Sequence, residues 1–334
     1  MRRTLTRVPG LPGMGAFVSL NMRRPDPKGC MGGHEGRHEL KREMGLASAT
    51  FLVVASMVGS GIFTTSGLIM EDLRDPQAML LCWVIGGAFA LCGALCYGEL
   101  GAMFPRAGGE YVFLSESFGK LMGFLSGWIS LIVGFSAPIA AAAIAFVSYF
   151  ARAFPDPVAQ RLDAPLIQSG SVSISSLTLL AVGTIALFAV VHSHSLNLGS
   201  RVQNLLTLFK IAIILFFVAM GLGSGHGSTA HFTSARNPGH FFSAGLASSL
   251  IFISFAYSGW NAAVYLGGEI RNPARNIPLS LLIGTLMVTV LYLFMNVTYI
   301  YALPVEEMSG ILEIGAKSAT ALFGVRNGKV FYMA

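Results

Sequence analysis

Seven stretches of this chain are apolar over about 20 residues, the length an α-helix needs to cross the ~30 Å hydrocarbon core of a membrane. Charged residues make up 11% of the chain and hydrophobic residues 54%, so a water-soluble globular domain is nearly excluded. We expect an all-α polytopic membrane protein. The expected spans are approximately Gly45–Met70, Ala78–Phe104, Leu121–Phe150, Ile174–Val191, Val202–Leu222, Phe241–Gly267 and Leu279–Leu303, and an eighth helix begins near Ile314.

A basic arm precedes the first span. Nine of the 22 lysines and arginines lie before residue 43, in a segment rich in Gly, Pro and Arg that is too polar to span. The arm is expected to be a disordered cytoplasmic tail, and the remaining loop charges predict the same orientation in the cell membrane. The net charge of +6 therefore does not indicate a nucleic-acid partner, and the arm could contact anionic lipid.

No metal, cofactor or disulfide framework is expected. Cys82, Cys92 and Cys96 lie in one apolar segment and cannot form a disulfide framework. No span holds a metal motif or a nucleophile with its base, so the chain is not expected to be an enzyme. A group in the arm could be drawn as metal ligands, but three glycines and a single cysteine favour a solvated tail; its members are Cys30, His34, Glu35 and His38.

Two of the expected spans are interrupted near their middle. Gly59 and Gly61 break the first span, and the sequence YSG at 257–259 breaks the sixth. Either break alone could be a packing notch of small residues, but corresponding breaks in two segments indicate a transporter site. An unwound helix offers N–H groups to a carboxylate and C=O groups to a cation, so a zwitterion is the natural ligand.

Several polar or aromatic side chains lie near these breaks. Lys210 could reach towards a membrane surface, or it could point at the first broken helix, replace a sodium ion and couple transport to a proton. The amide of Asn261 needs a partner inside a membrane. Phe255, Tyr257 and Trp260 could either close over a substrate or fill the helix bundle.

Four motifs resemble the amino acid-polyamine-organocation superfamily, with bacterial amino-acid permeases and L-type exchangers as the most similar branches. The motifs are GSGIF at 59–63, YGELGAMFPRAGGEY at 97–111, FAYSGWN at 255–261 and EIRNPARNIP at 269–278. This resemblance implies a LeuT-type fold of two inverted five-helix repeats, in which helices 1 and 6 are discontinuous. The implied divisions are the arm at 1–42, a first repeat at 43–223 and a partial second repeat at 240–334.

The resemblance also implies roles for individual residues. The substrate carboxylate would be held at the first break, and the amine and side chain at the second, with Lys210 in the place of a cation and no sodium requirement. Phe255 would gate the site, with Tyr257 and Trp260 as further gating residues. The implied substrate-binding residues are Met57, Gly59, Ser60, Gly61, Phe255, Ala256, Ser258 and Asn261.

We therefore expect sodium-independent transport of amino acids by proton symport or exchange. A polyamine or basic amino-acid antiporter is the alternative, although neither break carries an acidic residue that would favour it. The chain ends inside the implied second repeat, which predicts a C-terminally truncated permease with about seven spans and leaves a non-transporting fragment as a further possibility. The expected partners are the amino acid, protons and the bilayer, and a partner subunit is left open.

Overall fold

The computed structural model describes residues 41–152, 162, 164–169, 172–194, 196–233 and 244–331. The fold described below belongs to the unit Leu40–Ala334. The predicted arm lies outside the described residues apart from its last two positions, and so do the four side chains considered there as metal ligands.

Helices account for nearly all of the regular structure. They begin and end as follows: α1 Leu46–Met57, α2 Gly61–Leu73, α3 Pro76–Met103, α4 Glu110–Phe118, α5 Lys120–Ile129, the π-helix η1 Ser130–Ser136, α6 Ala137–Arg152, α8 Ser176–His194, α9 Leu196–Gly223, the 3₁₀ turn η2 Thr229–Phe232, α10 Ala244–Ala256, α11 Ala262–Tyr265, α12 Pro273–Ala302, α13 Val305–Met308 and α14 Ile314–Phe331. Two short strands, β1 Pro165–Ser169 and β2 Val172–Ser175, form an antiparallel hairpin in the loop before α8.

The helices confirm an all-α polytopic membrane protein. Within the described residues, five stretches are long and apolar enough to cross a membrane: α3, the run from α5 through η1 into α6, α8, α9 and α12. A sixth is the pair α1 and α2, which bends by 43° at the first predicted break. The predicted sixth span is also broken, because α10 ends at Ala256 and α11 begins at Ala262.

The helix expected near Ile314 is present. Helix α14 begins at that residue, but it is less apolar than the spanning helices. Its backbone also leaves the helical conformation at Gly324, where φ is 77°.

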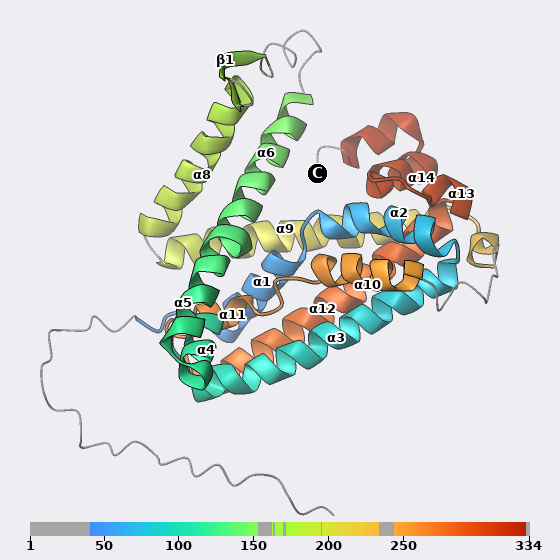
Figure 1. Cartoon of the computed structure of the whole chain (residues 1–334). Coiled ribbons are helices and arrows are strands. Elements are labelled where there is room, and N and C mark those ends of the chain that lie inside the picture. Colours follow the sequence, from blue (N-terminus) through green and yellow to red (C-terminus); the bar gives the residue numbers. More distant parts are fainter. Residues whose placement is uncertain are drawn as a thin grey trace, which may run out of the picture. The chain divides into compact units, whose positions relative to one another are not determined.

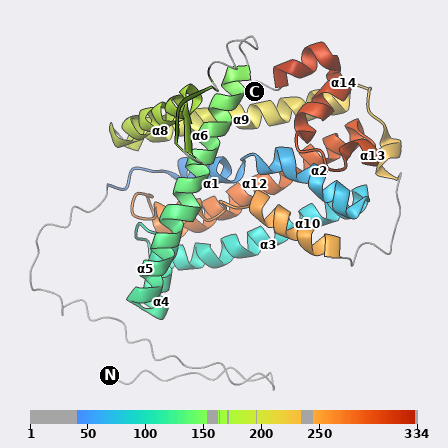
Figure 2. The ribbon, with the colours of Figure 1, turned by 45° about the horizontal axis from the view of Figure 1, so that its top comes forward.

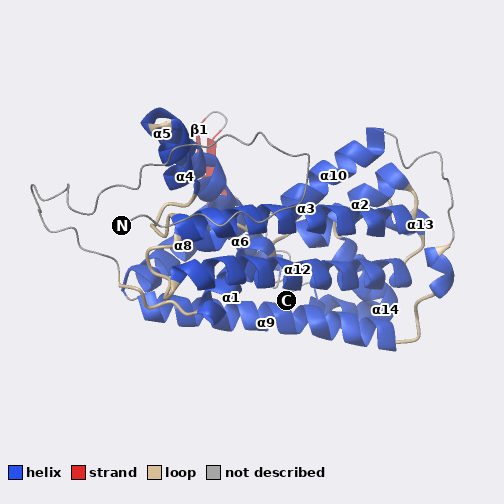
Figure 3. Ribbon diagram, turned by 90° about the horizontal axis from the view of Figure 1, so that it is seen from below, coloured by secondary structure: helices blue, strands red, loops and turns tan. Residues whose placement is uncertain are grey.

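Helix α12 lies at the centre of the main bundle. It packs along α3 on one side and against α1 and α9 on another, so that α3, α12 and α9 form successive layers (Figure 3). Helix α10 lies beside α2, and α14 contacts both α2 and α9 (Figure 2). The central position of α12 brings one helix into contact with the segments on both sides of the first break.

Helices α6 and α8 pack against each other (Figure 1) and enclose a small apolar cluster of their own. Most of the large apolar side chains from α5 to α8 are exposed, for example Phe124, Val133 and Leu187. Apolar side chains at the surface of a spanning helix contact lipid tails rather than water, so this exposure is consistent with a bilayer.

Two backbone pairings join distant segments at one end of the bundle. Met44 forms a parallel bridge with Ile270, and Ala107 forms an antiparallel bridge with Leu266. The segment before α1 and the loop between α3 and α4 therefore both pair with the loop between α11 and α12. We call this end, at which Met44, Ala107, Leu266 and Ile270 lie, the bridged end.

Local sequence explains where the long helices begin. Asp75 caps α3 by accepting hydrogen bonds from the N–H groups of Gln77 and Ala78, and Pro76 occupies the first helical position. Pro273 likewise lies at the first helical position of α12. Proline suits this position because its missing N–H would have no partner within the helix.

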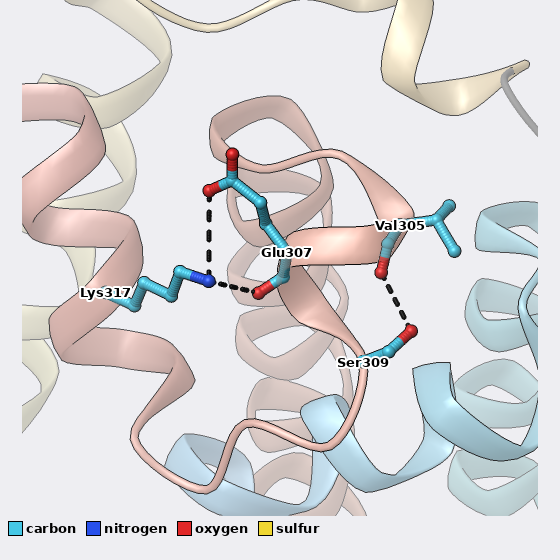
Figure 4. A network of polar contacts seen from close by, with 4 residues as sticks. All are labelled: Val305, Glu307, Ser309 and Lys317. Atoms are coloured by element: carbon cyan, nitrogen blue, oxygen red, sulfur yellow. Dashed lines mark hydrogen bonds and ion pairs between the residues drawn. The ribbon is translucent and has the colours of Figure 1, made fainter.

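A polar contact fixes the segment between α13 and α14 (Figure 4). The Lys317 ammonium donates to the main-chain carbonyl of Glu307 over 2.6 Å and lies 3.8 Å from its carboxylate. The Ser309 hydroxyl donates to the carbonyl of Val305 over 2.8 Å. These contacts tie the start of α14 to the turn that follows α12.

Candidate functional site

The first break exposes backbone groups between α1 and α2. Helix α1 ends at Met57, Val58 leaves the helical conformation with φ −77° and ψ 90°, and α2 begins at Gly61. Gly59 and Ser60 are exposed, whereas Met57 is buried. The Ser60 side chain does not cap α2, so the first N–H groups of this helix have no side-chain acceptor. An uncapped helix start of this kind suits a carboxylate.

The second break is a turn of five residues, Tyr257 to Asn261, between α10 and α11. Gly259 lies in this turn with φ 98°, a conformation that side chains disfavour. A Cβ at Gly259 would lie 2.5 Å from the carbonyl oxygen of Ser56. Glycine is thus required both by the turn and by its close approach to α1.

The two breaks lie against each other. A Cβ placed on Gly61 would lie 2.9 Å from the Cα atom of Ala256, the last residue of α10. Together with the approach of Gly259 to Ser56, this contact brings the start of α2 and the end of α10 to one place. The uncapped N–H groups of one helix and the final carbonyls of another therefore converge, as a zwitterion would require.

Tyr292 of α12 joins the breaks directly. Its buried hydroxyl lies 2.7 Å from the carbonyl oxygen of Met57 and 3.1 Å from that of Ala256. The last residues of α1 and α10 therefore share one donor. The ring packs edge-on against Trp83 of α3, with ring centroids 5.4 Å apart.

Lys210 of α9 points towards the first break. Its ammonium group donates to the carbonyl oxygen of Val58 over 2.6 Å, and the side chain is partly buried. Of the two orientations considered from the sequence, the structure has the inward one. A cationic donor at the carbonyl end of α1 is electrostatically favourable.

The expected gating side chains occupy different surroundings. Phe255 is 74% exposed, and Ser258 is also exposed. Tyr257 is only 1% exposed, and its hydroxyl donates to the Trp83 carbonyl over 3.1 Å. Trp260 packs edge-on against Tyr97 of α3 at 4.9 Å. Tyr257 and Trp260 thus contribute to bundle packing in this conformation, and the gating roles stay predictions.

Asn261 lies with a different group of residues. Its side-chain amide donates to the carboxylate of Glu110 at the start of α4 over 2.6 Å. The hydrogen-bond partner that this amide needs is therefore supplied by Glu110, a residue of the protein. A substrate role for Asn261 stays a prediction.

Sequence reasoning missed Tyr292 and Glu110. Tyr292 lies inside an apolar stretch, and its phenol group could have been singled out because a buried hydroxyl needs an acceptor. Glu110 gave less signal, since its position between two spans is also typical of an ordinary loop carboxylate. Among the described residues, no group of three or more His, Cys, Asp or Glu side chains is placed to hold a metal ion.

Comparisons of the sequence with known proteins identify a family. The profile of a family described as "Amino acid permease" matches residues 44–334. The human b(0,+)-type amino acid transporter 1 is 33% identical over 294 residues, which cover 87% of this chain and 58% of the relative. The mouse large neutral amino acids transporter small subunit 2 is 30% identical over 306 residues, covering 90% and 55%. The chain thus spans little more than half the length of these relatives.

Proposed function

Because the chain belongs to the amino acid permease family, within the superfamily that its motifs resemble, we propose that it takes part in secondary active transport of amino acids. The convergence of the two helix breaks is the observation that carries this proposal. Gly61 and Ala256 are in contact, so the start of α2 and the end of α10 address one space. The relatives' names describe amino acid transporters, which agrees with a ligand that has one positive and one negative end.

In the proposed binding mode, the substrate carboxylate lies at the start of α2. The N–H groups of Ser60 and Gly61 at the start of α2 bind it, because no side chain caps this helix. Gly59 lets the substrate approach the backbone there, although its own N–H donates to the carbonyl of Met57 over 2.9 Å. The α-amine lies near the end of α10, where the carbonyls carry partial negative charge, at Phe255, Ala256 and Ser258. The exposed ring of Phe255 then covers the bound substrate as a gate.

Lys210 takes the coupling role in this proposal. Its ammonium donates to the Val58 carbonyl, an oxygen to which a sodium ion could otherwise bind. Transport is therefore independent of sodium. Loss of the lysine proton removes the positive charge from the end of α1, so protonation and the conformation of the first break are linked, as symport or proton-linked exchange requires.

Transport of polyamines or basic amino acids is the second candidate. A second positive charge on the substrate would need a carboxylate near the breaks. Among the described residues, Glu110 is the carboxylate in contact with the second break, through Asn261. Its oxygens accept hydrogen bonds from protein donors, so neutral amino acids are favoured. A fragment that does not transport is the third candidate, whether or not it binds an amino acid.

The decisive experiment is uptake of a mixture of radiolabelled amino acids into proteoliposomes that contain this chain. Uptake is measured with and without an imposed proton gradient, and in sodium or choline buffer. The expected result is accumulation that the proton gradient increases and sodium does not. A relative of greater length serves as the positive control, and absence of uptake beside an active control rejects transport by this chain.

The proposed location is the cell membrane, with the N-terminus in the cytoplasm. This orientation follows from the excess of lysine and arginine before residue 43. Labelling of a cysteine introduced into the arm, in intact and then in permeabilised cells, tests it. Labelling only after permeabilisation is expected.

A further inference from the structure

The carboxylate of Glu110 accepts hydrogen bonds from three elements of the fold. Oε1 accepts from the amide of Asn261 over 2.6 Å and from the hydroxyl of Tyr97 over 3.3 Å. Oε2 accepts from the hydroxyl of Tyr265 over 3.0 Å. Tyr97 belongs to α3, Asn261 to the second break and Tyr265 to α11, so one side chain connects both ends of α11 to α3 and α4.

This carboxylate is stabilised without a cation. Glu110 forms no salt bridge among the described residues, whereas Glu116, two turns further along α4, pairs with Arg106 over 3.1 Å at the surface. The charge of Glu110 is balanced by three neutral donors and by the N–H groups at the start of α4. Hydrogen bonds to a charged acceptor are stronger than neutral ones, so the group is a firm attachment for α11.

The backbone beside Glu110 leaves little space between α4 and α11. Gly109 has φ 52°, and a Cβ there would lie 2.9 Å from the ring of Tyr265. The N–H of Gly108 donates to the carbonyl of Tyr265 over 3.1 Å. The neighbouring bridge between Ala107 and Leu266 continues this contact at the bridged end. Main chain and side chain thus hold α11 at the same place.

We propose that Glu110 is a positioning residue that holds α11, the half-helix after the second break, against α3 and α4, and so closes the site at the bridged end. This inference rests on the proposed transport function, since a closed end matters only if a substrate passes. Release of α11 requires the carboxylate to give up its three donors together. Asn261 then serves as a contact within the protein and not as a substrate ligand.

The test measures exposure of α11 and does not depend on transport. Val264 of α11 is 2% exposed and packs against Gly101 of α3, so a cysteine at 264 becomes reactive when α11 separates from α3. The chain is placed in lipid nanodiscs, where both faces are accessible, and its reaction with a maleimide is timed. Val288→Cys, at a fully buried position of α12, reports global unfolding. The native cysteines are first replaced; they are Cys30, Cys82, Cys92 and Cys96.

Glu110→Gln is expected to speed labelling at position 264 by about tenfold without changing the rate of labelling at position 288. Asn261→Asp places two carboxylates in contact and should have a similar or larger effect. The double variant exchanges the amide and the carboxylate, so the contact can form again with reversed roles, and labelling should return towards the parent rate. Glu116→Gln, on the same helix, is the matched control and should leave the rate unchanged.

Three results would overturn the proposal. The first is parent-rate labelling at 264 in Glu110→Gln, because α11 would then be held without the carboxylate. The second is a double variant labelled at least as fast as its faster single variant, because the contact between Glu110 and Asn261 would then not hold α11. The third is equal acceleration at 264 and 288, because the effect would then be general destabilisation. Absence of amino-acid uptake by the parent chain would reject the transport function while leaving the labelling result valid.

Discussion

The hydroxyl of Tyr292 lies 2.7 Å from the carbonyl oxygen of Met57, the last residue of the helix before the first break. Because the same hydroxyl lies 3.1 Å from the carbonyl of Ala256, it relates the ends of two broken helices that are far apart in the sequence. One hydroxyl has one proton, so it donates to only one of the two carbonyls at a time. The orientation of the hydroxyl therefore decides which of the two carbonyls receives the hydrogen bond from Tyr292.

Tyr292→Phe removes this shared donor and keeps the ring. We expect the free energy of unfolding to fall by about 1 kcal/mol, because the carbonyls of Met57 and Ala256 lose a shared donor. Amino-acid binding should weaken as well, since this hydrogen bond between the two breaks is lost. Thermal unfolding in detergent and ligand-induced stabilisation measure the two effects. Tyr111→Phe, at a 49% exposed side chain, is the control, and an equal loss in both variants would contradict a specific role for Tyr292.

Gly61→Ala and Gly59→Ala form a matched pair. A Cβ at Gly61 would lie 2.9 Å from Ala256, whereas a Cβ at Gly59 has nothing within 4 Å. Gly61→Ala is therefore expected to cost about 1–3 kcal/mol of stability and to weaken substrate binding, and Gly59→Ala to be tolerated. Binding of a labelled amino acid by equilibrium dialysis distinguishes them. Equal binding by the two variants would show that the contact between the breaks is not part of the site.

Lys210→Ala is expected to abolish the pH dependence of uptake while the chain still inserts into the membrane. The substitution removes the ammonium group that donates to the Val58 carbonyl. Uptake into proteoliposomes over a range of external pH is the measurement, with Lys120→Ala, at an exposed position, as the control. A pH profile that matches the parent would reject the coupling role.

Glu269 gives a prediction for stability. It lies in the loop before α12, one carboxylate oxygen is buried without a hydrogen-bond partner among the described residues, and burial raises its pKa above the ordinary value of 4.5. The nearby Arg42 donates to the carbonyl of Ile270 instead. The folded chain therefore binds a proton more tightly than the unfolded chain, so stability rises as pH falls from neutral through the folded-state pKa.

Glu269→Gln should remove this part of the pH dependence and stabilise the chain at neutral pH, because the carboxamide carries no charge to desolvate. Unfolding temperatures at several pH values between about 4 and 8 measure it. Glu306→Gln, at an exposed position after α12, should leave the pH dependence in place. If the unfolding temperature changes with pH equally in the parent and in Glu269→Gln, the prediction is wrong.

Much of the fold could be predicted because its signals are local. Length and apolarity locate the spans to within a few residues, and a glycine pair or a small polar triplet marks each break. The extent of α10 and the polarity of α14 were less clear, since an apolar count alone does not distinguish a short half-helix from a complete span. The hairpin before α8 was also not anticipated.

The contacts that assemble the site could not be predicted, because they join residues that sequence spacing does not relate. Tyr292 and Met57 are 235 residues apart, and Asn261 and Glu110 are 151 apart. An amide inside a membrane reveals that it needs a partner, but not which one. The orientation of Lys210 was open for the same reason, since both surroundings can satisfy an ammonium group.

The two bridges at one end of the bundle have a consequence for how such chains can diverge. Met44 pairs with Ile270, and Ala107 with Leu266, through main-chain groups that every residue except proline provides. Only at the exposed Ala107 can the side chain change freely without loosening that end, with proline barred where an N–H is needed. Met44 and Ile270 are also buried in the core, so they must stay apolar even though their pairing is made by main-chain groups.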